Sequence, residues 1–325
     1  MTTLAILDLG SNSVRMMVNR INTDGSYEVL DRRQEMVRMS AGMGDKKTLQ
    51  PDAIDRTLDA LKNFKKIYQS FGDDVVVQAV ATAAIRQARN QADFLKKFRD
   101  VMGFDLRVIS GEEEAEFDYI GVVNSLPIND ALILDTGGAS TEMILVKSGK
   151  MRQRVSLPIG AVNLTESYLE KDVVSAQSFF NALRAVQAYL SDVAWVPEAR
   201  HFPIIAIGGS NRTLAKISRK RANQGDLPVH GYHMDRGQLQ DLYTELLGKN
   251  KDDRIAVRGL AKERGDIIIG GLLPLMTLLE KIDSAQVIFS QSGIREGVLF
   301  SAIEAETKHH VRTPEANQLT VDSDD

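Results

Sequence analysis

The sequence predicts an α/β protein made of two similar halves. Short apolar runs alternate along the chain with segments whose apolar residues recur every three or four positions, as expected for strands alternating with amphipathic helices. Two stretches also match each other, AILDLGSNSVRMMV at 5–18 and LILDTGGASTEMILV at 132–146, so that Asp8 and Asp135 hold the same place in each. At about 150 residues per domain, a length of 325 residues fits two domains. We therefore expect a duplicated domain rather than two coincidentally similar turns.

The first half begins with an apolar run over 4–9 that includes Asp8 and is followed by Gly10, which is typical of a buried strand entering a turn. A second strand is expected at 14–18. Pro51 opens a helix whose apolar residues recur at helical spacing from Ile54 to Phe71. The other elements expected before residue 124 are strands at 27–30, 75–81 and 106–109, and helices at 83–101 and from about 111.

The second half restarts the pattern with an apolar run that ends in Asp135. Because Pro and Asn interrupt the chain at 124–130, we expect one domain over 1–126 and another over 127–304. The polar, acidic segment 305–325 lacks any periodicity and is predicted to be disordered. The further elements expected are strands at 131–135, 143–146, 154–157, 204–207 and 286–289, and helices at 160–170, 175–191, 235–247, 265–281 and 293–304.

Composition and charge exclude several classes of protein. Apolar residues make up 43% of the chain, enough for a sizeable core, and no cysteine is present to build a disulfide framework or a zinc–thiolate site. The net charge of −4 argues against a protein that wraps duplex nucleic acid. The N-terminus carries no basic region, and the longest apolar run, 267–279, is shorter than the roughly 20 residues that span a bilayer. We therefore expect a soluble, cytoplasmic protein that does not act on membranes.

Two loops rich in small residues follow the strands that carry Asp8 and Asp135. Glycines let backbone N–H groups approach an anion, and hydroxyl and amide side chains add further donors. The loop residues expected to bind phosphate are Gly10, Ser11, Asn12, Ser13, Gly137, Gly138, Ser140 and Thr141. A carboxylate beside bound phosphate needs a divalent cation between them, so Asp8 and Asp135 are predicted ligands of Mg²⁺, with Glu142 acting through water. Alternatively, both aspartates only accept hydrogen bonds from turn N–H groups.

Other residues could serve the same chemistry. Gly208 and Gly209 follow an apolar strand and lead into a helix, which would place helix N–H groups at a phosphate or a ribose. Arg15 lies just past the first phosphate loop, and Arg86 lies where strand 75–81 gives way to a helix. Guanidinium groups at such places suit bidentate phosphate contacts, although most arginines are solvated surface groups.

An acidic cluster opens the helix that begins near residue 111. Ser110 and Glu113 have the spacing of a capping box, and acidic residues stabilise the N-terminal end of a helix, so the cluster has a structural explanation. Glu114 is the glutamate that this cap does not use. We identify it as a candidate general base that accepts a proton from the water attacking a phosphoanhydride.

The sequence resembles the exopolyphosphatase / guanosine pentaphosphate phosphohydrolase family, which belongs to the actin-like ATPase superfamily. The resemblance covers about 1–304. The motifs that carry it follow one another in order at 8–15, 82–86, 109–115, 134–142, 157–161, 206–209 and 293–297. It implies two ribonuclease-H-like α/β domains flanking a central cleft.

The resemblance also implies roles for single residues. Glu114 would be the catalytic base and Arg86 a phosphate ligand, while Asp135 and Glu142 would hold Mg²⁺ or its waters. Ala139 stands where the family usually has a third glycine, so the second loop is expected to be tighter or less accessible to phosphate. The chain stops near 304–325, and the helical C-terminal domains of longer members are not expected.

The hypothesis that follows is an exopolyphosphatase that uses Mg²⁺ to hydrolyse the terminal phosphate of inorganic polyphosphate. One alternative is a hydrolase that removes the 5′-phosphate of guanosine pentaphosphate. A second is a non-catalytic sensor that binds guanosine tetra- or pentaphosphate, although Glu114, Asp135 and Glu142 are all present. A third is a phosphotransferase to ADP. The oligomeric state is left open, with a homodimer among the candidates.

Overall fold

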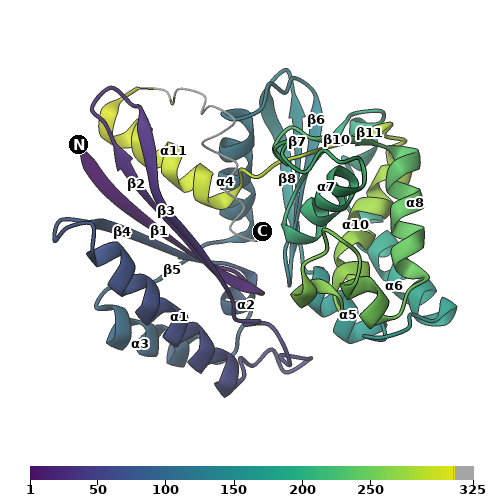
Figure 1. Cartoon of the computed structure of the whole chain (residues 1–325), viewed down its shortest axis with the longest axis horizontal. Helices are drawn as coiled ribbons and strands as arrows, with labels where there is room; N and C mark the ends of the chain where they lie inside the picture. The colour runs from purple at the N-terminus through teal and green to yellow at the C-terminus, as the bar shows by residue number, and fades with distance from the viewer. Residues whose placement is uncertain (310, 312–325) are drawn as a thin grey trace. The chain divides into compact units, whose positions relative to one another are not determined.

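Two α/β units make up the chain in the computed structural model, which describes residues 1–309 and 311 (Figure 1). The first unit contains residues 1–125 and the described residues from Ile294 onward, and the second contains Leu126–Gly293. The sequence predicted one domain over 127–304, but helix α11 (Ile294–Thr307) belongs with the first unit. The reason is that its apolar residues, such as Phe300, are buried in one cluster with residues of the first strand. The rest of the predicted tail, 310 and 312–325, lies outside the described residues.

The described residues of the first unit form a five-stranded sheet with the order β3-β2-β1-β4-β5. The first three strands are antiparallel neighbours, whereas β4 and β5 run parallel to β1. The bounds of the strands are β1 (Thr2–Leu9), β2 (Ser13–Ile21), β3 (Tyr27–Met36), β4 (Val76–Ala81) and β5 (Arg107–Val108).

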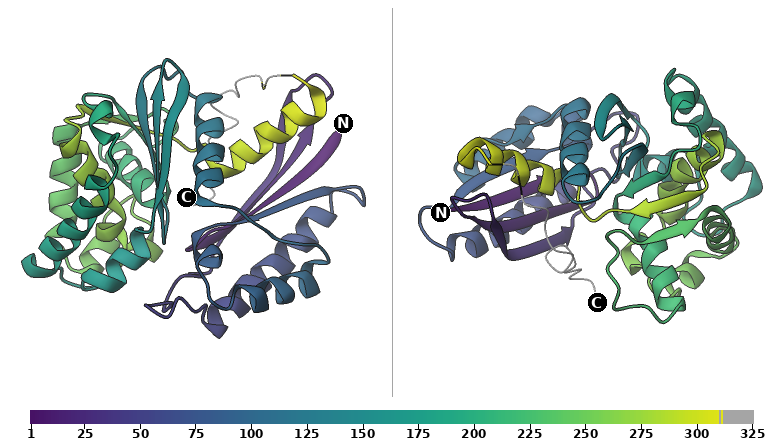
Figure 2. Two further views of the ribbon diagram at one scale, coloured as in Figure 1. Left: turned by 180° about the vertical axis from the view of Figure 1, so that it is seen from behind. Right: turned by 90° about the horizontal axis from the view of Figure 1, so that it is seen from above.

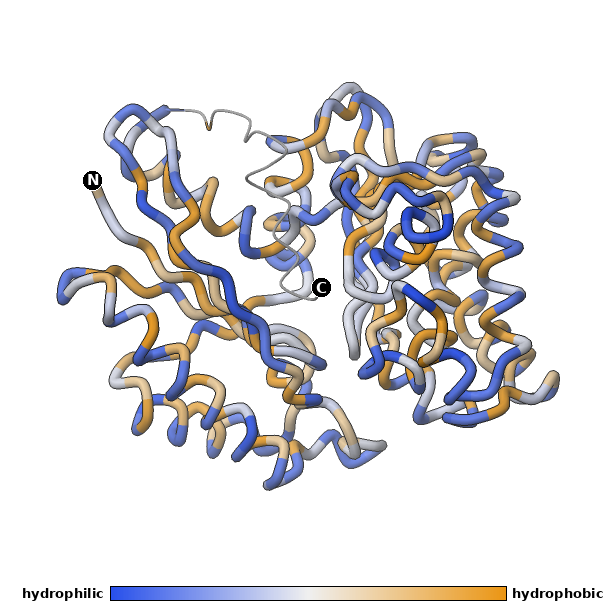
Figure 3. The backbone as a smooth tube through the Cα atoms, viewed as in Figure 1, coloured by the Kyte–Doolittle hydropathy of each residue, from blue (hydrophilic) through white to orange (hydrophobic). Residues whose placement is uncertain are grey.

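Helices cover both faces of this sheet. Side chains alternate between the faces of a strand, so Leu7 of β1 joins a cluster with α1 (Pro51–Gln69) and α3 (Gln91–Met102). Ile6 points the other way, into a cluster with α4 (Gly111–Val123) and α11. Both views in Figure 2 place α11 beside α4. In Figure 3 hydrophilic and hydrophobic segments alternate along α1, as expected for a helix with one buried face.

The helix predicted over 83–101 is two helices, α2 (Ala83–Arg86) and α3, so this prediction was wrong in its continuity. Asn90 explains the break. Its side-chain amide accepts a hydrogen bond from the N–H of Leu49 at 2.9 Å and donates one to the carbonyl of Leu49 at 3.1 Å. This long-range tie holds the chain out of helical geometry between the two helices and leaves Arg86 at the end of a single turn.

The second unit repeats the strand order of the first. Its described residues form a six-stranded sheet in the order β10-β11-β9-β6-β7-β8. Strands β6, β7 and β8 are antiparallel neighbours, β9 and β11 run parallel to β6, and β10 is an additional antiparallel strand at the edge. The bounds of the strands are β6 (Ala131–Thr136), β7 (Thr141–Lys147), β8 (Lys150–Leu157), β9 (Ile204–Ile207), β10 (His233–Asp235) and β11 (Gln286–Phe289). The shared order confirms the predicted fold class of two ribonuclease-H-like α/β domains.

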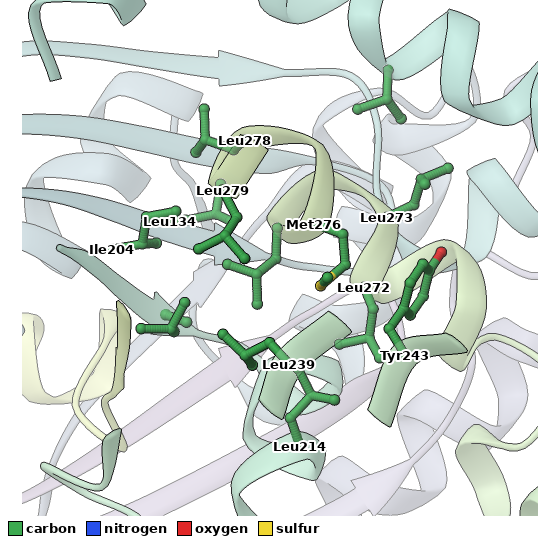
Figure 4. Close-up of a cluster of buried hydrophobic side chains, with 14 of the residues drawn as sticks. Leu134, Ile204, Leu214, Leu239, Tyr243, Leu272, Leu273, Met276, Leu278 and Leu279 are labelled. Atoms are coloured by element: carbon green, nitrogen blue, oxygen red, sulfur yellow. The ribbon is translucent and has the colours of Figure 1, made fainter. Parts of the chain in front are cut away.

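One large apolar cluster forms the core of the second unit. Figure 4 shows Leu134 of β6 and Ile204 of β9 facing Leu279 and other residues of a long apolar helix. The helices of this unit are α5 (Ala161–Tyr168), α6 (Ala176–Ser191), η1 (Val196–Ala199), α7 (Gly209–Arg221), α8 (Arg236–Leu247), α9 (Lys251–Ile255), η2 (Lys262–Arg264) and α10 (Ile268–Lys281). The longest apolar run of the sequence lies mostly in α10 and is buried in this core. None of the helices in the described part of the chain has the length and apolar character needed to cross a membrane.

Candidate functional site

The first predicted phosphate loop is a tight turn between β1 and β2. The N–H of Gly10 donates to the carbonyl of Ser13 at 3.1 Å. The carbonyl of Asn12 accepts the N–H groups of Val37 and Arg38 at 3.1 and 2.8 Å, which fixes the loop from behind. Asn12 is only 8% exposed, and neither the nitrogen nor the oxygen of its side-chain amide has a hydrogen-bond partner in the described structure. Buried polar groups are normally bonded, so this amide is suited to a ligand.

Asp8 is a buried acid beside this loop. It lies directly opposite Arg15 in the β1–β2 register, and the nearest atoms of the two side chains, Nη1 and Oδ2, are 4.0 Å apart. Burial raises the pKa of the Asp8 carboxyl above its ordinary value, and the charges of Arg15 and Arg295 offset part of this effect. Oδ1 has no hydrogen-bond partner among the described residues. The ionised carboxylate would therefore be stabilised by a further cation.

Glu114 and Arg86 form a buried ion pair in the first unit. Glu114 is 5% exposed, and its Oε2 accepts a hydrogen bond from Nη1 of Arg86 at 2.8 Å. The same Nη1 donates to the carbonyl of Ile109 at 3.0 Å, which fixes the guanidinium against the segment between β5 and α4. Within the described structure, Nε and Nη2 of Arg86 make no hydrogen bond. Arg86 can thus orient the carboxylate while part of its guanidinium stays available to an anion.

The neighbouring glutamate has the structural role predicted for it. Ser110 accepts the N–H of Glu113 at 3.1 Å, and Glu113 accepts the N–H of Ser110 at 2.8 Å, which confirms the capping box. The hydrogen bond from the Ser110 backbone, reinforced by Arg107, lowers the pKa of Glu113 below its ordinary value. Adjacent glutamates on α4 therefore differ in environment, since one caps the helix at the surface and Glu114 is buried.

The second phosphate loop repeats the turn of the first. The N–H of Gly137 donates to the carbonyl of Ser140 at 3.0 Å, which matches the bond between the equivalent residues of the first loop. The start of α5 packs directly on the loop, because a Cβ atom at Gly160 would lie 2.7 Å from the backbone nitrogen of Ala139. Ala139 itself is not among the residues with a positive φ, so its side chain adds no backbone strain. Thr141 donates to the carbonyl of Ile159 at 2.6 Å.

Asp135 and Glu142 lie directly opposite each other on β6 and β7. Facing residues of an antiparallel pair point to the same side of the sheet, so both carboxylates share one face. Glu142 is buried, and its Oε1 accepts a hydrogen bond from Ser156 at 2.6 Å. Gly208 packs against Asp135, since a Cβ there would lie 2.7 Å from Oδ1 of that carboxylate and 2.5 Å from the carbonyl of Thr136.

Three charged residues without a predicted role lie beside predicted ones. The guanidinium of Arg264 lies against Gly209, where even a methyl group would overlap it. The charges of Arg295 and Glu296 on α11 act on Asp8, and Glu296 also lies 3.9 Å from Arg32. The motif at 293–297 was the signal for the latter two, but its pattern does not reveal which strand it contacts.

The carboxylates of each unit, taken by itself, suit a hard divalent cation held partly by water. In the first unit the Oδ1 of buried Asp8 has no hydrogen-bond partner among the described residues. In the second unit Asp135 and Glu142 offer carboxylate oxygens on one face of the sheet. No three acidic or histidine side chains in the described part of the chain gather into a complete metal cage. Mg²⁺ commonly binds through one or two carboxylates, with waters and substrate phosphates completing its shell.

Comparison with known proteins gives consistent matches. The model of the Ppx/GppA phosphatase family matches residues 17–306. The guanosine-5′-triphosphate,3′-diphosphate pyrophosphatase of Vibrio atlanticus is 29% identical over 316 residues, which is 95% of this chain and 61% of that protein. The chain thus spans less than two thirds of the length of this curated relative.

Solved structures agree with the fold. The PPX-GPPA enzyme of Aquifex aeolicus is 31% identical, with a TM-score of 0.75 over 92% of this chain and 99% of that one. An exopolyphosphatase from Cytophaga hutchinsonii reaches a TM-score of 0.87 over 94% of this chain and 98% of its own. At 21% identity the latter likeness concerns the fold alone.

Proposed function

Since the chain belongs to the Ppx/GppA phosphatase family, we propose that it hydrolyses the terminal phosphoanhydride of linear inorganic polyphosphate and releases orthophosphate. The observation that carries the proposal is the buried Glu114 carboxylate held by Arg86 at 2.8 Å. A carboxylate fixed in this way is suited to deprotonating water, and an adjacent guanidinium is suited to phosphoryl oxygens.

In the proposed reaction, Glu114 accepts a proton from water as the water oxygen bonds to the terminal phosphorus. The bond from that phosphorus to the bridging oxygen breaks, and the shortened chain leaves with the bridging oxygen. The N–H groups and hydroxyls of loops 10–13 and 137–141, together with Arg15 and the Gly208–Gly209 turn, bind phosphoryl oxygens. Asp8, Asp135 and Glu142 would hold Mg²⁺, which when bound neutralises the charge of these oxygens.

A second candidate is removal of the 5′-phosphate of guanosine pentaphosphate. It is favoured by the 29% identity to the Vibrio atlanticus pyrophosphatase over 95% of this chain. Against it, the group beside Gly209 is the Arg264 guanidinium, which suits phosphate, whereas a nucleotide would need a surface for its base there. We therefore keep polyphosphate as the proposed substrate.

The test is orthophosphate release with Mg²⁺ present, measured separately on long-chain polyphosphate and on guanosine pentaphosphate. Faster release from polyphosphate, judged by kcat/KM, is expected. Faster release from guanosine pentaphosphate would favour the second candidate. If the folded protein binds either substrate but releases no orthophosphate, it would be a sensor and not an enzyme. A parallel reaction with ADP would reveal a phosphotransferase by the formation of ATP.

A further inference from the structure

The loop that connects β3 to α1, residues 37–50, joins the two parts of the first unit that the proposed reaction uses (Figure 1). At one end, the N–H of Arg38 donates to the carbonyl of Asn12 at 2.8 Å, and Ser40 donates to the carbonyl of Ser11 at 2.9 Å. The loop therefore lies directly against the first phosphate loop.

The other end of the loop lies against the segment that follows Arg86. Nζ of Lys47 donates to the side chain of Gln87 at 3.0 Å, and the carbonyl of Lys47 accepts the N–H of Arg89 at 2.8 Å. Gln87 immediately follows Arg86, whose guanidinium holds Glu114. The loop thus places the backbone of one basic residue against the phosphate loop and the side chain of another against Gln87, the residue that follows Arg86.

Both of these basic residues have a backbone conformation that favours glycine. Arg38 has φ 50° and Lys47 has φ 49°, in the left-handed region that side chains rarely adopt. Five other non-glycine residues in the described part of the chain share this conformation, Ser148 among them, so the angle by itself assigns no role. At Arg38 and Lys47, however, it holds long cationic side chains on a loop that contacts the first phosphate loop, at a cost in free energy. What suggests a role for these two side chains is their charge together with their place on a loop that contacts both the first phosphate loop and Gln87.

The unpaired amide of Asn12 gives independent support for a ligand at this place. It is buried with no hydrogen-bond partner in the described structure, and its own carbonyl is the group that binds the N–H of Arg38. Asn12 therefore connects a candidate ligand-binding group, its side-chain amide, to the backbone of Arg38 through its main-chain carbonyl. Lysine and arginine both suit phosphate: lysine offers a compact positive charge, and arginine can donate two parallel hydrogen bonds.

We propose that Arg38 and Lys47 bind the phosphates that follow the terminal one, so that loop 37–50 selects a phosphate chain over a single phosphoanhydride. This inference rests on the proposed function. It assigns these two residues to substrate specificity, while proton transfer stays with Glu114. Their contribution grows with the number of phosphates that the substrate carries.

The decisive variant is Arg38→Gly, because it removes the guanidinium and relieves the positive φ together. We expect the KM for long-chain polyphosphate to rise about tenfold or more, the loss of one charged contact, while the KM for pyrophosphate changes by less than about twofold. We expect kcat to stay within about twofold and the melting temperature not to fall. Lys47→Gly should act in the same direction, and Arg38→Lys should restore part of the affinity.

The matched control is Ser148→Gly, which relieves a positive φ of 54° in the turn between β7 and β8 and removes no charge. It should leave both KM values unchanged. An equal change in KM for short and long substrates, or none for either, in a folded Arg38→Gly protein would overturn the inference. Absence of phosphate release by the wild-type protein would instead contradict the proposed function. In that case the dissociation constant for polyphosphate, compared between Arg38→Gly and wild type, decides the inference alone.

Discussion

Replacement of Arg86 by alanine should impair turnover, beyond any loss of phosphate binding. Glu114 is 5% exposed, and its Oε2 is 2.8 Å from Nη1 of Arg86. Removing one partner of a fully buried ion pair costs about 3–5 kcal/mol. The side chain of Arg86 is 21% exposed, so solvent screening reduces the expected cost to about 1–3 kcal/mol, the penalty for leaving a buried hydrogen-bonding group without its partner.

Without Arg86, the Glu114 side chain is expected to change its conformation or to bind a proton. Either change removes a correctly placed general base. If the cost appears in the barrier, kcat falls by about 5- to 150-fold. The KM should rise as well, since Nε and Nη2 can contact phosphate, and that part of the defect should shrink at high salt. The assay is orthophosphate release at saturating and subsaturating substrate over a series of salt concentrations.

The control is Arg107→Ala, which breaks a similar pair with Glu113 on the same helix. The side chains of that pair are 60% and 40% exposed, so kcat should stay within about twofold. A folded Arg86→Ala protein with unchanged kcat and a raised KM would refute the reasoning, because Arg86 would then act only as a phosphate ligand. A double variant with Glu114→Gln should be no slower than Glu114→Gln alone, since both changes disable one base.

Other outcomes follow from single contacts. Burial raises the pKa of Asp8, so the folded state favours the neutral carboxyl and loses stability as rising pH ionises it. Asp8→Asn should therefore have a higher melting temperature than wild type at pH 7 and a smaller increase in melting temperature on addition of Mg²⁺. Calorimetry with and without the cation checks this, and an equal effect of Mg²⁺ on both proteins would contradict it. Gly208→Ala, at φ 93°, should destabilise the fold by about 1–3 kcal/mol in urea unfolding, whereas Gly225→Ala, in open space, should be neutral. Hydrogen bonds from Ser178 and Ser175 lower the pKa of Glu170 to about 2. The stability that the ionised Glu170 contributes should therefore be lost only as pH falls from its ordinary pKa toward about 2. An NMR titration in which the Glu170 carboxyl binds its proton near pH 4.5 would contradict this prediction.

Local features of the fold were predictable because their causes are local. The turn at Gly10 and its repeat at Gly137 follow from short runs of small residues between apolar strands, and both show the same N–H to carbonyl bond. The cap at Ser110 depends on residues three positions apart, so the sequence alone identifies it. The aspartate of each half lies at the strand end that its apolar run predicted.

Features set by distant contacts were not predictable in this way. The break between α2 and α3 arises from Asn90 bonding to Leu49, 41 residues away. β3 extends to Met36 because its polar residues pair with β2, although they show no apolar alternation. The return of α11 to the first unit follows from packing of its apolar face, which no spacing within the helix reveals.

The candidate site shows the same division. Residue types and spacing identified Glu114 and Arg86 separately, but their bond joins residues 28 positions apart and gives Arg86 a positioning role that its pattern did not indicate. Arg264 beside Gly209 was not identified, because it ends a short helical turn that has no motif of its own. The strained pair Arg38 and Lys47 becomes visible only from backbone angles.

The turnover of a Glu114→Gln variant tests most directly whether Glu114 is the catalytic base. Glutamine keeps the shape of the side chain and an oxygen that can accept the hydrogen bond from Arg86, but it cannot take a proton from water. We predict a fall in kcat of about 10²–10⁴-fold, with the dissociation constant for polyphosphate and the melting temperature nearly unchanged. Turnover equal to that of wild type would show that the proton goes elsewhere and would contradict the central claim.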